Sequence, residues 1–378
     1  MNRLQQLQQL GQSIWLDFIS RDALRSGELA ARIESGVLGM TSNPAIFEKS
    51  MGSGNAYDAD IAKLAKLDRS TLEIYETLAL EDIAAAAALL KPIYDRTDAL
   101  DGYVSIEVSP RLARDTAGTV AEAKRLWQAL GRPNIMIKIP GTSEGVPAIR
   151  EAIASGINVN VTLLFGVDAY AAVAEAYLKG LEQRAAAGAP LAGVASVASF
   201  FVSRVDTEID KRLDAKVAEG ALTASQGAEL KGKAAIANAK LAYLHFTTQF
   251  SGPRWDALRA KGAQVQRPLW ASTSTKNPAY RDVIYVEELV GPDTVNTLPP
   301  ATLDAFRDHG ETRRTIDQGL DAATFALAAV QSVGVPLRDV TDQLLREGLA
   351  AFQKSFDTLL AGLETKAAAL GRPVTAAR

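Results

Sequence analysis

The sequence contains no cysteine and only two histidines among its 378 residues. The missing cysteines exclude disulfides, thiolate nucleophiles and cysteine-ligated zinc. The two histidines, His245 and His309, do not form an HxxxH-type pair, which argues against a Ser-His-Asp triad and a histidine-rich metal site. Carbon–carbon or acyl chemistry in this chain would therefore depend on lysine and on carboxylates.

The sequence also lacks a strong net charge and a long apolar run. With 41 basic and 44 acidic residues the formal net charge is −3, and no basic arm or stripe indicates nucleic acid. The longest unbroken apolar run, residues 83–90, is too short to span a bilayer. The N-terminal MNRLQQLQQLGQ is typical of an amphipathic helix and not of a signal peptide. We therefore expect a cytoplasmic protein without nucleic-acid or membrane partners, whose anionic ligands are held by a few local residues.

Eight short β-like segments recur along the chain, separated by helical stretches rich in alanine and leucine. Strands that alternate with helices favour a parallel sheet, and eight of them predict a (β/α)₈ TIM barrel. The predicted strands are SIWLD (13–17), GVLGMTSN (36–43), GYVSIEVS (102–109), NIMIKIP (134–140), GINVNVTLLF (156–165), GVASVAS (193–199), VQRPLWAS (265–272) and DTVNTLP (293–299).

Three of these strands alternate polar and apolar residues. The polar faces are Ser105, Glu107 and Ser109 in YVSIEVS, Asn158, Asn160 and Thr162 in INVNVTL, and Thr294 and Asn296, opposite Val295, in TVNTL. An α/β sheet covered on both faces would be apolar on both, so we expect the polar faces to point into a functional chamber inside the barrel. The alternative, an antiparallel sheet with one solvated face, fits the long helical connections less well.

Two helical insertions interrupt the strand pattern, at about 44–100 and 204–262. The second contains TASQ (223–226), which has the form of a capping box. The residues after 300 are typical of closing C-terminal helices. Because no glycine/serine linker and no internal repeat divides the chain, we expect one barrel domain over residues 1–378.

Lys138 is the one charged residue within NIMIKIP, at the carboxyl end of the predicted strand, where TIM barrels carry their sites. A neutral lysine amine attacks a carbonyl to form a Schiff base, and a low-dielectric enclosure favours the neutral form of an amine. The strand pattern alone is equally compatible with a lysine that reaches solvent or pairs with a carboxylate.

Two carboxylates at other strand ends, Glu107 and Asp17, favour catalysis. Imine formation needs an acid that protonates the departing hydroxyl, and cleavage of the carbon–carbon bond needs a base that deprotonates a substrate hydroxyl. Each carboxylate alone is compatible with a structural ion pair to Lys138. Two carboxylates and several neutral donors exceed what a single ion pair requires.

Further polar residues follow the strand ends. Asn43, Asn160, Thr162 and Ser199 are candidates to bind substrate hydroxyls or a water, although such residues also pair with one another. Arg204 is a candidate bidentate phosphate ligand, with a surface ion pair as the alternative. The turn ASTSTKN (271–277) contributes Ser272 and Lys276 after the seventh strand, where barrels frequently bind phosphate.

Together these segments resemble the transaldolase family, specifically its longer-chain branch. The motifs occur in the family's order between about residues 10 and 300 and are GMTSNPAIF, SIEVSPRLARDT, IKIPGTSEG, GINVNVTLLF, SFFVSRVD and WASTSTKNP. The resemblance implies a (β/α)₈ barrel of the class I aldolase type that needs no metal and no cofactor. It also implies a transferase of the pentose phosphate pathway, which moves a dihydroxyacetone unit from sedoheptulose 7-phosphate to glyceraldehyde 3-phosphate and gives erythrose 4-phosphate and fructose 6-phosphate.

The resemblance also implies a role for each matching position. Lys138 matches the Schiff-base lysine, Glu107 the glutamate that works through a water, Thr162 the residue sharing that water, Asp17 the acid/base aspartate, Asn43 and Asn160 the ligands of substrate hydroxyls, Ser199 the donor-site serine, Arg204 the phosphate-binding arginine, and Phe201 the aromatic beside the site.

One position departs from the pattern. The shorter-chain branch carries a phosphate-binding arginine two residues after the serine that Ser272 matches. Here that position is Ser274. The nearest cation, Lys276, is therefore our candidate for the second phosphate ligand.

Two alternatives remain at this point. A related aldolase would release free dihydroxyacetone, and the resemblance implies that it carries glutamine at the position of Glu107 and tyrosine at that of Phe201. A non-catalytic barrel would bind sugar phosphates without a Schiff base. We expect phosphorylated ketoses and aldoses as partners, and a monomer or a homodimer.

Overall fold

The computed structural model describes residues 1–67 and 69–370. Its centre is a closed barrel in which the eight strands follow one another in sequence order, and β8 pairs in parallel with β1. The strands are β1 (Gln12–Leu16), β2 (Gly39–Thr41), β3 (Val104–Glu107), β4 (Ile135–Pro140), β5 (Val159–Leu164), β6 (Ser196–Phe201), β7 (Gln266–Ala271) and β8 (Thr294–Leu298). The predicted (β/α)₈ barrel and its eight strands are confirmed.

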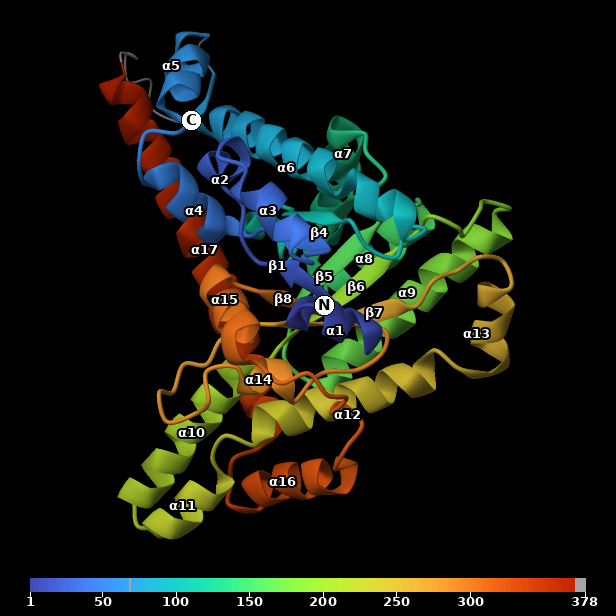
Figure 1. Cartoon of the computed structure of the whole chain (residues 1–378), viewed down its shortest axis with the longest axis vertical. Coiled ribbons are helices and arrows are strands. Elements are labelled where there is room, and N and C mark those ends of the chain that lie inside the picture. Colours follow the sequence, from blue (N-terminus) through green and yellow to red (C-terminus); the bar gives the residue numbers. More distant parts are fainter. Residues whose placement is uncertain (68, 371–378) are drawn as a thin grey trace.

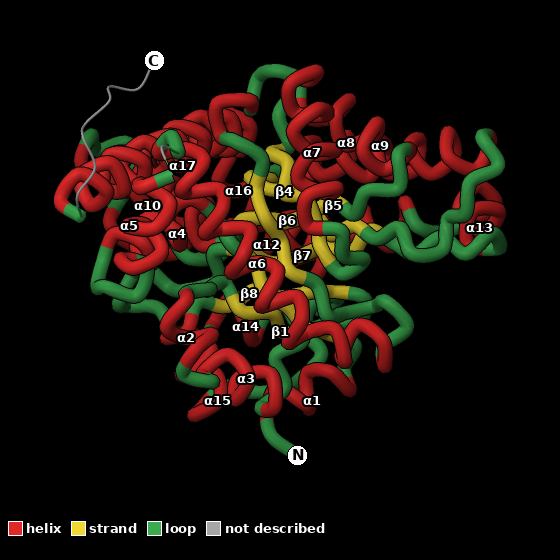
Figure 2. Tube along the Cα trace, turned by 90° about the horizontal axis from the view of Figure 1, so that it is seen from above, coloured by secondary structure: helices red, strands yellow, loops and turns green. Residues whose placement is uncertain are grey.

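Helices enclose the strands on the outside, as the red and yellow segments of Figure 2 show. They are α1 (Arg3–Gln9), α2 (Arg21–Arg25), α3 (Glu28–Glu34), α4 (Pro44–Gly52), α5 (Asp58–Lys66), α6 (Thr71–Arg96), the 3₁₀ helix η1 (Pro110–Leu112), α7 (Thr116–Leu130), α8 (Gly145–Ala154), α9 (Val167–Ala186), α10 (Ser203–Ala218), α11 (Ala224–Leu230), α12 (Ala234–Gln249), α13 (Gly252–Arg259), α14 (Ile284–Glu287), α15 (Pro300–His309), α16 (Leu320–Ser332) and α17 (Leu337–Ala369).

The two predicted insertions contain α4 to α6 and α10 to α13. The predicted capping box at TASQ is present, because the Thr223 and Gln226 side chains bond each other's backbone N–H at the start of α11. A single domain over 1–378 stays a prediction, and residue 68 and residues 371–378 of that range lie outside the described part.

The predicted inward faces hold for β3 and β5. Glu107 is aligned with Lys138 and Lys138 with Asn160 across neighbouring parallel strands, and aligned residues point to the same face of a sheet. The Asn160 side chain also donates a 2.9 Å hydrogen bond to the Ser105 hydroxyl. These polar residues therefore share the barrel interior.

The prediction is wrong for β8, where Thr297 and not Asn296 faces the interior. Thr297 is aligned with Trp15, and its hydroxyl lies 2.7 Å from that of Thr41. Thr294 is on the opposite face and accepts a 3.0 Å hydrogen bond from Gln12. Polar groups on the outer face are satisfied there by side chains and loop backbone, so polarity alone does not identify the inner face of this strand.

A polar cluster closes the amino-terminal end of the barrel. Asp101 accepts hydrogen bonds from Trp15 (2.9 Å) and Ser13 (2.7 Å) and pairs with Arg267 at 3.0 Å. The Trp15 ring fits because residue 39 is glycine, where an added Cβ would lie only 2.6 Å from ring atoms. With this end filled, the open space of the barrel lies at the carboxyl ends of the strands.

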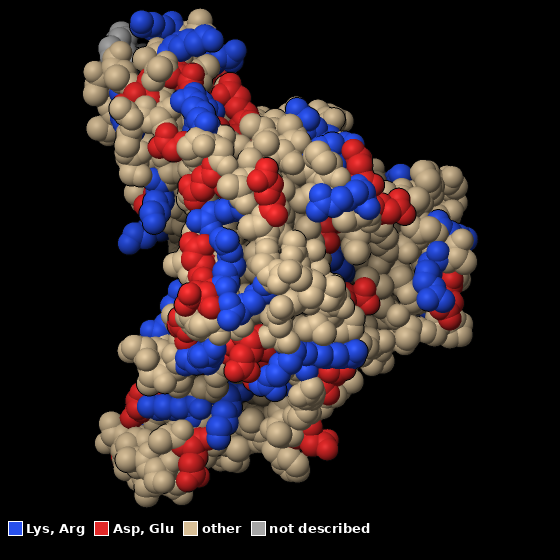
Figure 3. Space-filling model, in the orientation of Figure 1, with Lys and Arg blue, Asp and Glu red and all other residues tan. Residues whose placement is uncertain are grey.

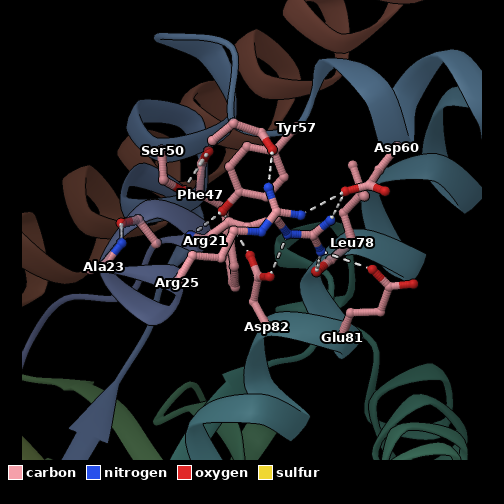
Figure 4. Close-up of polar contacts among 12 residues, drawn as sticks. Arg21, Ala23, Arg25, Phe47, Ser50, Tyr57, Asp60, Leu78, Glu81 and Asp82 are labelled. Carbon is pink, nitrogen blue, oxygen red and sulfur yellow. Dashed lines mark hydrogen bonds and ion pairs between the residues drawn. The ribbon is translucent and has the colours of Figure 1, made fainter. Parts of the chain in front are cut away.

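A buried arginine attaches α5 and α6 to the barrel (Figure 4). Arg21, on α2, donates to Asp82 (2.8 Å), Asp60 (2.5 Å) and Glu81 (2.9 Å). Tyr57 completes the cluster with a 2.7 Å hydrogen bond to Asp82. The chain that follows β1 is thereby held against the first insertion.

The long helix α17 packs against α4, α5, α6, α10 and η1 and also contacts β5 (Figure 1).

Over the described ranges, no single helix is long and apolar enough to cross a membrane. Helices α16 and α17 meet that criterion only together, and they are bent by 87° relative to each other. Basic and acidic side chains are interspersed over the face shown in Figure 3.

Candidate active site

Lys138 lies within β4, whose residues are all buried, and its side chain is only 5% exposed. Its Nζ donates to the Ser42 carbonyl oxygen at 3.2 Å and lies 3.7 Å from Glu107 Oε2. The centre of the Phe352 ring is 5.7 Å from the same nitrogen. The amine is thus enclosed by one carboxylate, one carbonyl and one aromatic face.

Glu107, at the end of β3, is a carboxyl whose charge is disfavoured by its surroundings. Burial raises the pKa of Glu107 to about 7, the nearby Asp17 adds to the rise, and Lys138 opposes it. Within the described part of the chain, neither Glu107 Oε2 nor Thr162 Oγ1 has a hydrogen-bond partner. A general acid that works near neutral pH needs a carboxyl of this kind.

Asp17 immediately follows β1 and is held by its backbone and its side chain. Its N–H donates to the Leu298 carbonyl at 2.8 Å, and Oδ1 accepts a 2.6 Å hydrogen bond from the Thr41 hydroxyl. Burial raises the pKa of Asp17, while Lys138, Thr41 and Arg204 oppose that rise. Asp17 and Glu107 are therefore two carboxyls in different environments near one amine.

A hydrogen-bond chain fixes Asn160 on β5. Its Nδ2 donates to Ser105, and its Oδ1 accepts from the Ser199 hydroxyl at 2.7 Å. The side chain of Asn43 accepts from the N–H of Ile46 at 3.0 Å and caps α4. Both amides are thus oriented by the fold before any ligand binds.

Two cations mark the other end of the site. Burial lowers the pKa of Arg204, whose guanidinium lies 5.3 Å from the centre of the Phe201 ring. Lys276 donates to the Ser274 hydroxyl at 2.8 Å, and burial together with the nearby Arg204 lowers the pKa of Lys276. The repulsion between these two cations favours an anionic ligand beside them.

Ser272 links β7 to this cationic end. Its backbone is left-handed (φ 53°), an uncommon conformation for a residue other than glycine. Its carbonyl accepts from the Ser203 N–H at 2.9 Å, and the two hydroxyls lie 3.1 Å apart. The turn after β7 is thereby joined to the start of α10, which carries Arg204.

A cavity of about 230 Å³ connects these groups. Its lining includes eight of the predicted site residues, namely Asp17, Asn43, Lys138, Ser199, Phe201, Arg204, Ser272 and Lys276. Glu107 and Asn160 contact this lining through Lys138 and Ser199. Thr162 is buried on β5, two residues beyond Asn160. The structure therefore brings ten of the eleven predicted residues into one connected group, and the roles of all eleven stay predictions.

The lining also includes residues that the sequence analysis did not predict, among them Thr41, Thr297 and Phe352. Thr41 and Thr297 are polar residues at strand ends, so the rule used for the other positions would have included them. Phe352 comes from α17, more than two hundred residues after Lys138. Its local sequence is that of any amphipathic helix and contains no signal for a site.

A second, mainly apolar cavity of about 460 Å³ lies on the other side of Glu107. Phe47, Tyr75 and Phe356 are among its walls, and Asn43 borders both cavities. The carboxyl of Glu107 thus lies between the apolar cavity and Lys138.

Over residues 1–67 and 69–370, no group of three or more histidine, aspartate or glutamate side chains is placed to hold a metal ion.

The barrel with a polar cavity at the carboxyl ends of its strands has the architecture of the (β/α)₈ enzymes. The family described as Transaldolase/Fructose-6-phosphate aldolase matches residues 14–363. The chain belongs to this family, which confirms the resemblance seen in the sequence.

Curated relatives match nearly the whole chain. A protein named Transaldolase from Thermobifida fusca is 53% identical over 94% of this chain and 96% of its own length. Transaldolase 2 from Nostoc sp. is 49% identical over 97% of this chain and 98% of its own length. Transaldolase 1 from Streptomyces coelicolor is 51% identical over 95% and 93%.

Proposed function

We propose that the protein is a transaldolase that moves a dihydroxyacetone unit from sedoheptulose 7-phosphate to glyceraldehyde 3-phosphate, giving erythrose 4-phosphate and fructose 6-phosphate. The observation that carries the proposal is the buried Lys138 amine, 3.7 Å from a carboxylate of raised pKa. A lysine and two carboxyls supply the groups that Schiff-base chemistry requires. The names of the curated relatives agree with this function.

The first half-reaction begins when the neutral Lys138 amine attacks the donor's ketone carbon. Glu107, through a water shared with Thr162, protonates the hydroxyl of the adduct, which leaves as water and gives the iminium ion. Asp17 then removes the proton from the C4 hydroxyl, the C3–C4 bond breaks, and its electrons move into the iminium. The first aldose departs, and an enamine remains on Lys138.

The second half-reaction reverses these steps with the acceptor. The enamine carbon attacks the aldehyde carbon, and Asp17 returns its proton to the new hydroxyl. Water adds to the iminium carbon, and the amine departs from the new ketose. The side chains of Asn43, Asn160 and Ser199 form hydrogen bonds with the substrate hydroxyls. Ping-pong kinetics follow from a covalent intermediate that outlasts the first product.

Arg204 and Lys276 bind the substrate phosphate, assisted by Ser272. Arg204 offers a planar donor fork for phosphate oxygens, and Lys276 supplies a point charge. Both cations and Ser272 border the same cavity as Lys138. The phosphate is therefore held at one end of the chamber while the carbonyl reaches the amine.

The second candidate is the aldolase that releases free dihydroxyacetone, because the family's description includes fructose-6-phosphate aldolase. Glu107 and Phe201 favour transfer, since the resemblance implies glutamine and tyrosine in the releasing enzymes. We also propose that the enzyme acts on its sugar phosphates in the cytoplasm, because the reaction belongs to the pentose phosphate pathway, and that it is a monomer or a homodimer.

Borohydride trapping with fructose 6-phosphate tests the proposal. We expect a reduced dihydroxyacetone adduct on Lys138 by peptide mass mapping, and no adduct in Lys138→Met. An adduct on another lysine, such as Lys276, would contradict the role of Lys138, and no adduct at all would leave the non-catalytic barrel. Free dihydroxyacetone released without an acceptor as fast as the donor is consumed in the presence of one would identify the releasing aldolase instead.

A further inference from the structure

Phe352 is the part of the cavity wall that comes from α17. Its side chain is buried, borders the cavity that contains Lys138, and places its ring centre 5.7 Å from Nζ. That distance is within the range at which an aromatic face attracts a cation. The Phe352 ring therefore lies between the lysine and the backbone of α17.

The position of Phe352 is fixed by contacts along the whole helix. One turn earlier, residue 348 is glycine, and an added Cβ there would lie 2.9 Å from Leu163 and 3.8 Å from Arg204. Further along α17, Asp357 pairs with Arg111 at 2.8 Å and Lys366 pairs with Asp58 at 2.9 Å. The close approach at Gly348 brings the turn that carries Phe352 near the site, and the two pairs join the later part of α17 to η1 and α5.

We propose that Phe352 shields the lysine-bound intermediate from water and thereby favours transfer over release; this rests on the proposed function. In the unwanted route, a solvent proton adds to the enamine carbon and gives an iminium ion. Water then adds to the iminium carbon, the nitrogen–carbon bond breaks, and dihydroxyacetone leaves as the free ketone. The enamine carbon gains one proton, the ketone takes its oxygen from the water, and the two hydrogens of that water end on the lysine nitrogen. All atoms are thereby accounted for.

Both steps of that route need water close to the Schiff base, and an aromatic ring over the nitrogen excludes it. The same ring face stabilises the positive iminium, which occurs on both routes, so only the exclusion of water distinguishes transfer from release. A smaller aliphatic side chain would retain part of the shielding and lose the attraction to the cation. Phe352 is therefore a shielding residue, since no proton or bond passes through its ring.

Phe356 shows that an aromatic residue on this helix does not by itself cover the lysine. It lies one turn beyond Phe352 and packs edge-on against Tyr75, with ring centres 5.4 Å apart. It lines the larger apolar cavity, and it is absent from the lining of the cavity around Lys138 as far as the described residues define it. Phe356 is therefore a matched control for the loss of a buried aromatic from α17.

The test measures, for each variant, dihydroxyacetone released from fructose 6-phosphate and product formed by transfer to an added aldose phosphate. We expect Phe352→Ala to raise the ratio of release to transfer by about tenfold. Phe352→Leu should raise it less, because the leucine still excludes water. Phe356→Ala should leave the ratio at the wild-type value even if it lowers stability.

An unchanged ratio in Phe352→Ala, or an equal rise in Phe356→Ala, would overturn the proposal. If Phe352→Ala does not fold, Phe352→Leu is compared with Phe356→Leu. A rise in the ratio confined to Phe352→Leu, smaller than that expected for alanine, would support the proposal, and an unchanged ratio would overturn it. Failure of the proposed function is distinguishable, because the wild-type protein would then not transfer the unit to the added aldose phosphate, whether or not a Lys138 adduct is trapped. A wild-type protein that traps and transfers, with an unchanged ratio in the Phe352 variants, would refute the shielding role alone.

Discussion

At the scale of single residues, the raised pKa of Glu107 predicts a pH-dependent stability. The pKa of an ordinary glutamate is 4.5, and burial raises that of Glu107 to about 7. Between these pH values the folded protein keeps a proton that the unfolded chain has lost, so stability falls as pH rises. Glu107→Gln removes this proton equilibrium. We expect its unfolding free energy, relative to wild type, to increase by up to about 3 kcal/mol from pH 5 to pH 8.

Urea denaturation at the two pH values measures this effect. Glu34→Gln is the control, because Glu34 is an exposed carboxyl at the end of α3. The difference in unfolding free energy between Glu34→Gln and wild type should be nearly the same at both pH values. A Glu107→Gln protein whose relative stability stays constant or decreases at pH 8 would mean that burial does not disfavour the Glu107 charge.

Lys276 carries the prediction about the second phosphate ligand. Lys276→Met should raise the KM for fructose 6-phosphate about tenfold, the value of one charge-assisted hydrogen bond. The kcat should change little, because Lys276 does not touch the reacting carbons. Steady-state kinetics with unphosphorylated fructose provides the comparison, because the KM for fructose should be the same in Lys276→Met and in wild type.

Two further variants complete the Lys276 experiment. Lys276→Arg should restore most of the affinity for the phosphorylated donor. Lys211→Met, at an exposed lysine of α10 that pairs with Glu208, should behave like wild type. Equal increases in KM for fructose and fructose 6-phosphate would show that Lys276 supports the cavity without binding phosphate.

At the scale of elements, the order of strands and helices was predictable because local periodicity determines it. The strand run from Ile135 to Ile139 is apolar apart from Lys138, so the lysine stands out in it. The same rule assigned the wrong inner face to β8, where Asn296 accepts a 2.9 Å hydrogen bond from Thr273. In that strand both faces are buried, so the pattern had no solvent-exposed side to identify.

The contribution of α17 was beyond the reach of sequence periodicity. The repeat of apolar residues predicts a helix, and it does not specify which structure the helix packs against. Phe352 and Phe356 are both buried aromatics four residues apart, yet only the first borders the Lys138 cavity in the described part of the chain. That difference depends on how α17 crosses α4 and η1, which is a long-range packing result.

At the scale of the whole molecule, the Arg21 cluster determines how firmly the first insertion is joined to the barrel. Arg21 and Asp82 are almost fully buried, with side chains 6% and 4% exposed. Burial raises the pKa of Asp82, while Tyr57 and Arg21 oppose that rise. The cluster is therefore stable only while the guanidinium balances the buried carboxylate.

Replacement of Arg21 by methionine tests this attachment, because methionine fills similar space and carries no charge. Removal of one partner from a buried ion pair leaves the other uncompensated, so Arg21→Met should lower the unfolding free energy by about 3 kcal/mol. Arg25→Met is the matched control, since Arg25 pairs with the same Asp60 at 3.3 Å and is 60% exposed. An exposed pair contributes about 1 kcal/mol or less.

Urea denaturation at pH 7 measures the unfolding free energy of both variants. Equal losses in the two variants would show that burial of the cluster adds nothing to stability. A larger loss in Arg21→Met would show that the buried Arg21–Asp82 pair stabilises the protein more than the exposed Arg25–Asp60 pair does.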